Sequence, residues 1–158
     1  MKTIRFAIAV AATAILMPGP AYGQVGIGAH MARAADAFGG SLGLGLRVQL
    51  GVPLVPVSLA VNGEYFFADC PANDCSLYGT TFDLNYALPI PLLQPWVGVG
   101  WSVRELKVAG RQTTERGLNF GVGAQFRLTG VRPFVDVRYE LAPAPEKQYV
   151  MRIGLMVR

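Results

Sequence analysis

The chain has 158 residues, of which 52% are hydrophobic and 15% are charged, and its net charge is +4. This length suggests one domain, and this composition excludes wholesale disorder. Charged residues are scattered too evenly along the chain for a helical membrane protein. The chain has no basic cluster of the kind that binds nucleic acid. One histidine and two cysteines provide few ligands for a metal centre.

The first 23 residues have the layout of a secretory signal peptide. Lys2 and Arg5 supply positive charge, an uncharged apolar run covers residues 6–17, and small residues precede the expected cleavage site after Gly23. The run is shorter than the roughly 18 residues that cross a bilayer as a helix, and a retained N-terminal anchor is the alternative. Cleavage predicts a mature domain of residues 24–158. Its net charge is +2, compared with +4 for the whole chain, because Lys2 and Arg5 are removed with the signal peptide.

The mature chain alternates between apolar residues and polar or small ones with a period of two, which is the pattern of β-strands. In the segment 41–52, for example, every even position from Leu42 to Leu50 is leucine or valine. The alternation predicts eight strands of about ten residues, the length that a tilted strand needs to cross a bilayer. They cover residues 25–32, 41–52, 57–66, 79–88, 97–104, 118–128, 134–141 and 149–158.

The connections between these segments alternate in length. Residues 53–56, 89–94 and 129–132 form tight links, whereas residues 33–40, 68–76 and 106–115 form longer polar links and residues 142–147 a modest loop. We therefore predict an all-β fold, an eight-stranded antiparallel up-and-down barrel with turns at one rim and loops at the other.

The polar face of the strands indicates which side of the barrel faces outward. No predicted strand contains lysine, and the polar face is rich in glycine, which weakens a water-exposed strand but leaves room in a narrow lumen. The predicted apolar face carries no charge, and a lipid-facing arginine or lysine near the midplane costs roughly 2–4 kcal/mol. We expect a transmembrane barrel whose apolar face contacts lipid. A soluble periplasmic, lipocalin-like carrier with the apolar face around a hydrophobic ligand is the alternative.

The polar face supplies charges of both signs, which we expect to pair inside the barrel. They are Arg47, Glu64, Asp83, Arg104, Arg127, Asp136, Arg138, Glu140 and Arg152. We predict a structural plug, because an eight-stranded barrel is just wide enough for side chains to fill. A weak ion path is the functional alternative.

Aromatic residues are predicted to gather at both ends of the barrel wall. With the N-terminus in the periplasm, the outer rim receives Tyr65, Phe67, Tyr78, Tyr139 and Tyr149, and the periplasmic rim receives Tyr86 and Phe126. Aromatic girdles at both interfaces are typical of membrane barrels.

With these patterns, residues 24–158 resemble the small eight-stranded outer-membrane barrels of Gram-negative bacteria, the group that includes the OmpA membrane domain and the OmpX- and opacity-like proteins. The resemblance implies an outer-membrane location and recognition of the last strand by the barrel assembly machinery. In that group the last strand usually ends in an aromatic residue, whereas here the segment 149–158 ends in Arg158.

Few residues suggest chemistry. Cys70 and Cys75 flank a four-residue spacer in a predicted loop, and export makes a disulfide between them the favoured interpretation over a metal site with Asp69 and Asp74. The only histidine, His30, has no nucleophile motif near it, and we expect it to line the lumen. We predict no cofactor and no metal.

Three functions remain in view. The first, which we favour, is a structural or surface-interaction protein of the outer membrane, whose rigid barrel holds loops toward an unidentified partner. The second is the soluble carrier. The third is a lipid-modifying enzyme that uses His30, since fold alone does not exclude catalysis.

Overall fold

The computed structural model describes residues 24–35, 41–52, 55–67, 75–88, 90–108, 110–128, 130–141 and 148–157. The predicted signal peptide and Cys70 lie outside these ranges. For Cys75 the structure describes the backbone but not the side chain, so the predicted disulfide lies outside the described part of the chain. None of the described residues forms a helix long and apolar enough to cross a membrane.

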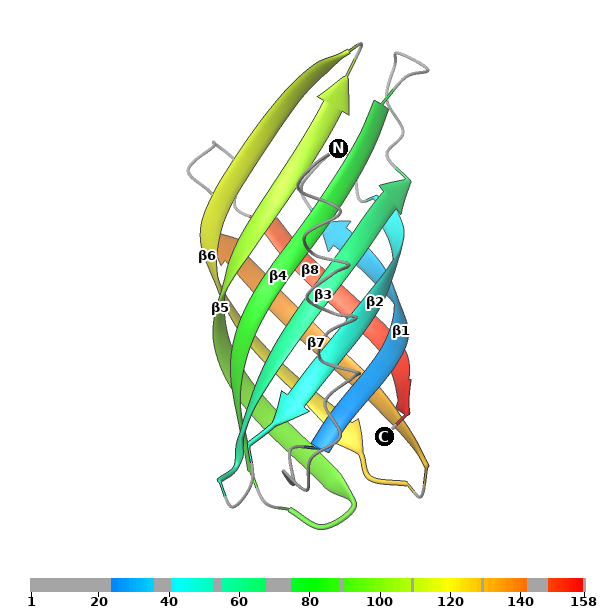
Figure 1. Ribbon diagram of the computed structural model, residues 1–158, viewed down its shortest axis with the longest axis vertical. Coiled ribbons are helices and arrows are strands. Elements are labelled where there is room, and N and C mark those ends of the chain that lie inside the picture. The colour runs from blue at the N-terminus through cyan, green and yellow to red at the C-terminus, as the bar shows by residue number, and fades with distance from the viewer. Residues whose placement is uncertain are drawn as a thin grey trace, which may run out of the picture.

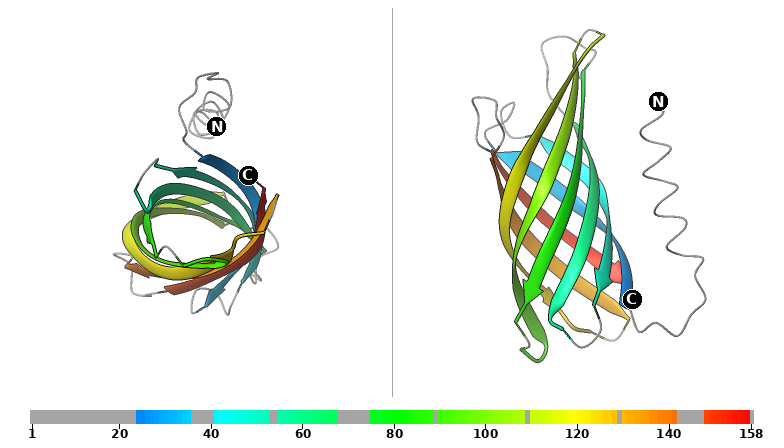
Figure 2. Two further views of the ribbon diagram at one scale, coloured as in Figure 1. Left: turned by 90° about the horizontal axis from the view of Figure 1, so that it is seen from below. Right: turned by 60° about the vertical axis from the view of Figure 1, so that its left-hand side comes forward.

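The described residues form eight antiparallel strands that close into one barrel, as the sequence predicts (Figure 1). Each strand pairs with its neighbours in the chain, and β1 pairs with β8 to complete the ring, which is visible along the barrel axis in Figure 2. The strands are β1 Gln24–Ala35, β2 Leu42–Gly51, β3 Val57–Phe67, β4 Cys75–Ala87, β5 Leu93–Val108, β6 Arg111–Phe126, β7 Val131–Leu141 and β8 Gln148–Val157.

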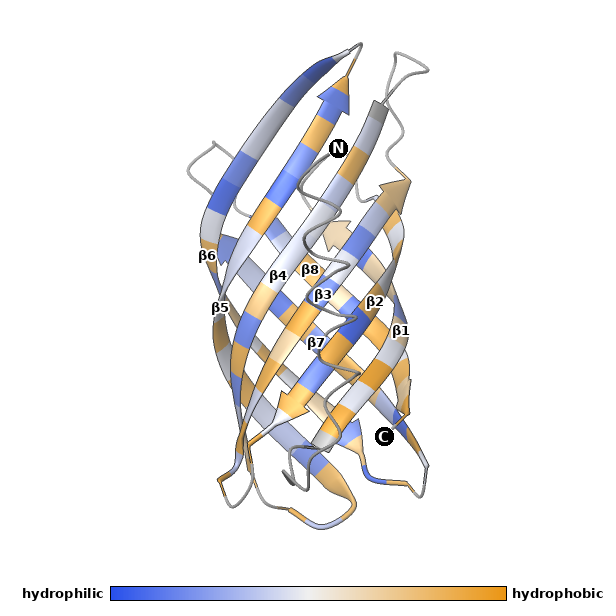
Figure 3. Ribbon diagram, viewed as in Figure 1, coloured by the Kyte–Doolittle hydropathy of each residue, from blue (hydrophilic) through white to orange (hydrophobic). Residues whose placement is uncertain are grey.

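The apolar face of each strand points outward and the polar face points into the lumen. Leu46 is 65% exposed on the barrel wall, whereas the next residue, Arg47, is 2% exposed inside it. The same alternation runs along β3, whose residues are buried and exposed in turn, and it appears as alternating colours along the strands in Figure 3. The barrel is therefore inverted relative to a soluble protein, with its polar residues at the centre.

The predicted loop at residues 106–115 is wrong, because β5 and β6 continue through most of it as a paired hairpin. Leu106 lies opposite Thr113, and Val108 lies opposite Arg111. In the right-hand view of Figure 2 this hairpin extends beyond the neighbouring strands. The outward apolar face ends here, because Glu105 and Lys107 point outward on β5 and β6 begins with six polar residues, so periodicity gave no strand signal.

The strand ends also correct the prediction that the outward face carries no charge. Strands β1, β5 and β6 are longer than predicted, and their outward-facing positions include Arg33, Glu105, Lys107 and Arg116 near the rim that receives the longer loops. The stretch of wall below these positions is apolar, so the charges mark one end of the hydrophobic band.

Outward-facing aromatic rings pack together near the same rim. Tyr65 contacts Phe67 and Tyr78, with ring centroids 5.3 and 5.2 Å apart, and Tyr139 contacts Tyr149 at 4.9 Å. These clusters lie where β3 meets β4 and where β7 meets β8. Their position is typical of an aromatic girdle at a membrane interface.

We expect Gly110→Val to lower the free energy of unfolding by about 1–2 kcal/mol, because Gly110 turns the β5–β6 hairpin with φ of +78°, a left-handed conformation that a β-branched residue adopts poorly. Urea-induced unfolding of the barrel in lipid vesicles, followed by tryptophan fluorescence, measures the loss. Asparagine tolerates this conformation, so Gly110→Asn is the control, and equal losses in the two variants would contradict the explanation.

Candidate functional site: the charged lumen

A chain of ion pairs crosses the centre of the barrel. The Arg152 guanidinium donates to the Glu64 carboxylate on the opposite wall, and its Nη1 lies 3.4 Å from Oδ1 of Asp136. Asp136 also accepts from Arg47, across the lumen on β2, at 2.7 Å. His30 on β1 shares Oε1 of Glu64 at 3.1 Å. Arg152 and Asp136 lie opposite each other on the paired strands β8 and β7. The other three contacts connect strands that do not pair with each other, so the chain as a whole links opposite walls of the barrel.

A second cluster surrounds Arg138 on β7. Its Nη1 lies 3.3 Å from Oδ1 of Asp83, and its Nη2 donates to Asn85 at 2.7 Å. Asp83 also accepts from the Asn62 amide at 2.9 Å and from the Thr81 hydroxyl at 3.1 Å. Amide and hydroxyl groups therefore hold the carboxylate that faces the buried guanidinium.

A third pair lies nearer the rim with the extended hairpin. Arg104 Nε donates to Oε2 of Glu140 at 2.7 Å, and Gln148 donates to the same oxygen at 3.0 Å. The Arg104 guanidinium also lies over the ring of Phe66 at 5.2 Å. Above this pair, an apolar cluster occupies the same end of the lumen, and its members are Ala32, Ala34, Phe66, Leu77 and Val150, with Leu106 packed against them.

Two inward-facing aromatic rings flank the ion pairs on the side of the tight turns. Trp96 lies near the start of β5 and Phe134 near the start of β7. The Arg47 guanidinium lies 4.8 Å from the Phe134 ring centre, and Arg138 lies 4.9 Å from that of Trp96. Cation–π contacts of this kind stabilise guanidinium groups that have lost water.

The lumen charges are balanced among the described residues. Four arginines and four carboxylates are buried there: Arg47, Arg104, Arg138, Arg152, Glu64, Asp83, Asp136 and Glu140. Taking an ion out of water costs several kcal/mol, which close, well-oriented partners offset. Each of these arginines lies within 4.0 Å of a carboxylate oxygen, so no described guanidinium at the centre is left without an acid.

One predicted lumen arginine lies elsewhere. Arg127 follows the end of β6, is exposed, and donates to Oε1 of Gln94 at 3.1 Å rather than to a carboxylate. β6 ends at Phe126, so Arg127 belongs to the rim on the side of the tight turns. The predicted strand was too long at this end because the apolar alternation continues one step past the last paired residue, as far as Leu128.

Sequence reasoning missed several lumen residues. Trp96 lay outside the predicted strand 97–104, although tryptophan directly before a run of alternating valines is a usable signal. The amides of Asn62, Asn85 and Asn119 are also fully or almost fully buried in the lumen, although they carry no charge. Buried polar groups require partners, so every inward amide of a narrow barrel is a candidate member of the network.

Glycines leave the space that the arginines fill. A Cβ built on Gly121 would lie only 2.6 Å from Nε and 3.0 Å from Cζ of Arg138. A Cβ on Gly123 would lie 2.6 Å from Cε2 of the Trp96 ring and 2.6 Å from the backbone oxygen of Val135. Since real Cβ atoms essentially never approach so closely, these positions require glycine for packing inside the barrel, as the sequence predicts.

Solved structures with the same fold are similar to this chain at low sequence identity. Neisserial surface protein A (NspA) has a TM-score of 0.58 at 18% identity, over 84% of this chain and 94% of that one. The N-terminal barrel domain of Pseudomonas aeruginosa OprF has a TM-score of 0.61 at 14% identity, over 85% and 98%. Ail, the attachment invasion locus protein of Yersinia pestis, has a TM-score of 0.55 at 14% identity, over 85% and 96%.

No protein-family model and no curated protein sequence matches the chain. The three structures are small eight-stranded outer-membrane barrels. Their likeness confirms, at the level of the fold, the resemblance predicted from the sequence.

We expect Glu64→Gln to lower the free energy of unfolding by about 3–5 kcal/mol, because it removes the shared acceptor of Arg152 and His30 and leaves a buried guanidinium short of an acid. Urea unfolding in vesicles checks the loss. Glu105→Gln, on a half-exposed outer position, is the control and should change stability by less than about 0.5 kcal/mol. Glu64→Leu combined with Arg152→Met should recover part of the loss, and a double variant as unstable as Glu64→Gln would contradict the pairing argument.

Gly121→Val tests the packing of Arg138. The added side chain meets the guanidinium stem, so we expect a loss of about 1–3 kcal/mol in the same assay. Gly63→Val is the matched control, since a Cβ at exposed Gly63 has no atom within 4 Å. If the two valine variants are equally stable, the space beside Gly121 is not needed.

Proposed function

We propose that the protein is an outer-membrane β-barrel with a structural or surface-interaction role and without catalysis. One observation carries the proposal: the closed barrel buries its charges in the lumen and presents an apolar wall. An apolar outer wall around a charged interior is stable only when lipid surrounds the wall. Closure of the barrel pairs the backbone N–H and C=O groups, which find no water inside a bilayer. The predicted signal peptide supports export.

The lumen contacts support a plugged interior rather than an ion path. The pairs Arg47–Asp136 and Arg152–Glu64 connect opposite walls, and the aromatic and apolar clusters occupy the lumen on either side of the ion pairs. The function then lies outside the barrel, in loops held by a rigid scaffold toward an unidentified partner. Assembly would use the barrel assembly machinery, with β8 as the recognised strand, and surrounding outer-membrane lipid would be the constant partner of the wall.

The two alternatives fit the geometry less well. A carrier of a hydrophobic ligand needs an apolar interior, whereas the described interior is charged at its centre. A catalytic His30 needs access to substrate, whereas His30 is 4% exposed and bonded to Glu64, and no described serine hydroxyl bonds to it. We therefore assign no catalytic residue, and the described residues contain no group of three metal-binding side chains.

A charge placed on the wall tests the membrane assignment. In phosphatidylcholine vesicles we expect Leu46→Arg to lower the free energy of unfolding by about 2–4 kcal/mol, because Leu46 lies on the apolar band at 65% exposure and arginine at that depth would face hydrocarbon. Urea titration measures the loss. The faster migration of unboiled samples in SDS confirms that each variant is folded.

Leu42→Arg is the matched control, because Leu42 lies on the same face of β2 but at its rim end and is 54% exposed. We expect this change to cost about 1 kcal/mol or less, since a rim arginine reaches the interface. Equal and negligible losses at both positions, with the protein in the soluble fraction, would overturn the proposed function.

A further inference from the structure

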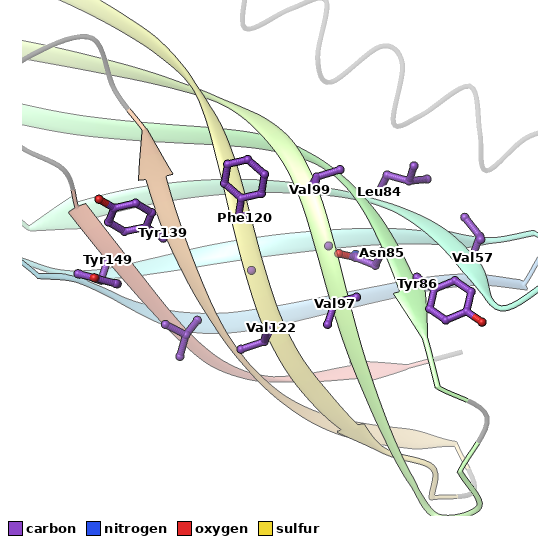
Figure 4. A pocket seen from close by; sticks show the side chains of 13 residues that line it. Val57, Leu84, Asn85, Tyr86, Val97, Val99, Phe120, Val122, Tyr139 and Tyr149 are labelled. Carbon is purple, nitrogen blue, oxygen red and sulfur yellow. The ribbon is translucent and has the colours of Figure 1, made fainter.

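The outer wall of the barrel is hollowed by a long groove. Its volume is about 680 Å³, and its lining is almost entirely apolar, with side chains contributed from β3 to β8 (Figure 4). Val97 and Val122 lie along it, and Phe120, Tyr139 and Tyr149 stand beside it. All five side chains belong to the outward-facing set of the wall.

The strand register explains why the wall is hollow there. Directly opposed residues form an unbroken row around the barrel that runs Tyr86, Val97, Val122, Val137, Met151 and Arg33. The adjacent row consists of Val99, Phe120, Tyr139 and Tyr149. Three small valines in succession beside three aromatic rings leave a trough along the valine row.

The valine row runs obliquely up the wall. Strands tilted by roughly 40° and spaced about 4.8 Å apart raise each row by about 3 Å per strand. Val97 lies near the turn-side start of β5, and Arg33 lies four strands away near the loop-side end of β1. The row therefore follows a path of about 19 Å from one side of the wall toward the opposite interface, which suits one extended acyl chain.

A cation lies on the same row, beyond the residues that line the groove and toward the loop-side rim. Arg33 is exposed on the outward face, between Met151 on β8 and Leu42 on β2. None of the ion pairs found among the described residues involves it. A guanidinium against an apolar wall and close to the interface attracts an anion, and phosphate suits its planar fork.

We propose that the valine row and Arg33 form a binding site for one phosphate-bearing lipid of the bilayer, with an acyl chain along Val97, Val122 and Val137 and the phosphate on Arg33. The site rests on the proposed function, because it needs the wall to face lipid. Tyr139 and Tyr149 add polar tips on apolar rings at the end of the trough where the headgroup lies.

The charges near the loop-side rim favour a lipid over a second copy of the chain. Among the described residues near the loop-side rim, the outward-facing charges are Arg33, Lys107, Arg116 and Glu105, three cations and one acid. Two copies would therefore bring like charges together at this level. A second wall groove is lined by Leu59, Val61, Phe82 and Trp101. Its row continues through Leu118 to Leu141 and meets no cation over this described stretch, so this groove serves as an internal comparison.

Native mass spectrometry of the protein purified from membranes in detergent tests the site, with dimyristoyl phosphatidic acid as the probe and dimyristoyl glycerol as the lipid without phosphate. We expect one tightly held phosphatidic acid. Val122→Phe fills the trough and should weaken binding of both lipids at least tenfold. Arg33→Gln should weaken only phosphatidic acid, also tenfold or more, to the level of the glycerol lipid.

Two matched variants separate a site from general adsorption. Val61→Phe fills the second groove and Arg116→Gln removes a cation away from the trough, so both should bind phosphatidic acid within twofold of the unchanged protein. Excess inorganic phosphate should not displace the lipid. Equal binding by all four variants, equal losses in all four, or displacement by free phosphate would overturn the proposal.

The outcome for the lipid site is distinguishable from that of the proposed function. Insertion into vesicles and the heat-dependent shift in SDS mobility are recorded for every variant. A barrel that inserts and shifts but does not discriminate between the variants refutes the lipid site alone. A barrel that does not insert refutes the membrane assignment.

Discussion

The structure depends on closure of the sheet between β1 and β8. This last ladder, from Ile27 opposite Val157 to Ala35 opposite Tyr149, removes the two free edges that an open sheet would present. Once the ring is closed, backbone polar groups in the wall are paired, and side chains alone decide what each face contacts. An apolar outside and a charged inside then become compatible with one chain of alternating residues.

The diameter of the ring sets what the inside can hold. With eight strands the interior has room for side chains but little more. Arg138 and Trp96 fit inside it because Gly121 and Gly123 leave space on the neighbouring strand β6. Small side chains also leave space on the outer wall. There the strand register places three valines opposite one another, and this row of small residues forms a trough.

The sequence predicted the number of strands, their order and the two faces, since a period of two is preserved wherever one face contacts a uniform environment. It failed where that environment changes. Residues 106–115 leave the apolar band and lose the alternation, although they remain paired. Arg127 was assigned to the lumen by parity alone, whereas the end of β6 places it at the rim. Which arginine meets which carboxylate was not predictable, because partners such as Arg47 and Asp136 lie on strands that never pair.

The β5–β6 hairpin leaves the barrel with one unshielded side. β6 pairs with β7 only as far as Leu118, opposite Leu141, and among the described residues none pairs with residues 111–117 on that side. Alternate amide and carbonyl groups of this stretch therefore have no strand partner among the described residues, unlike those of the wall below it. The barrel thus ends in two ways. Around most of its rim it ends as a closed cylinder in contact with lipid. Along residues 111–117 it ends as a sheet edge in water, because a bilayer does not accommodate unpaired backbone groups.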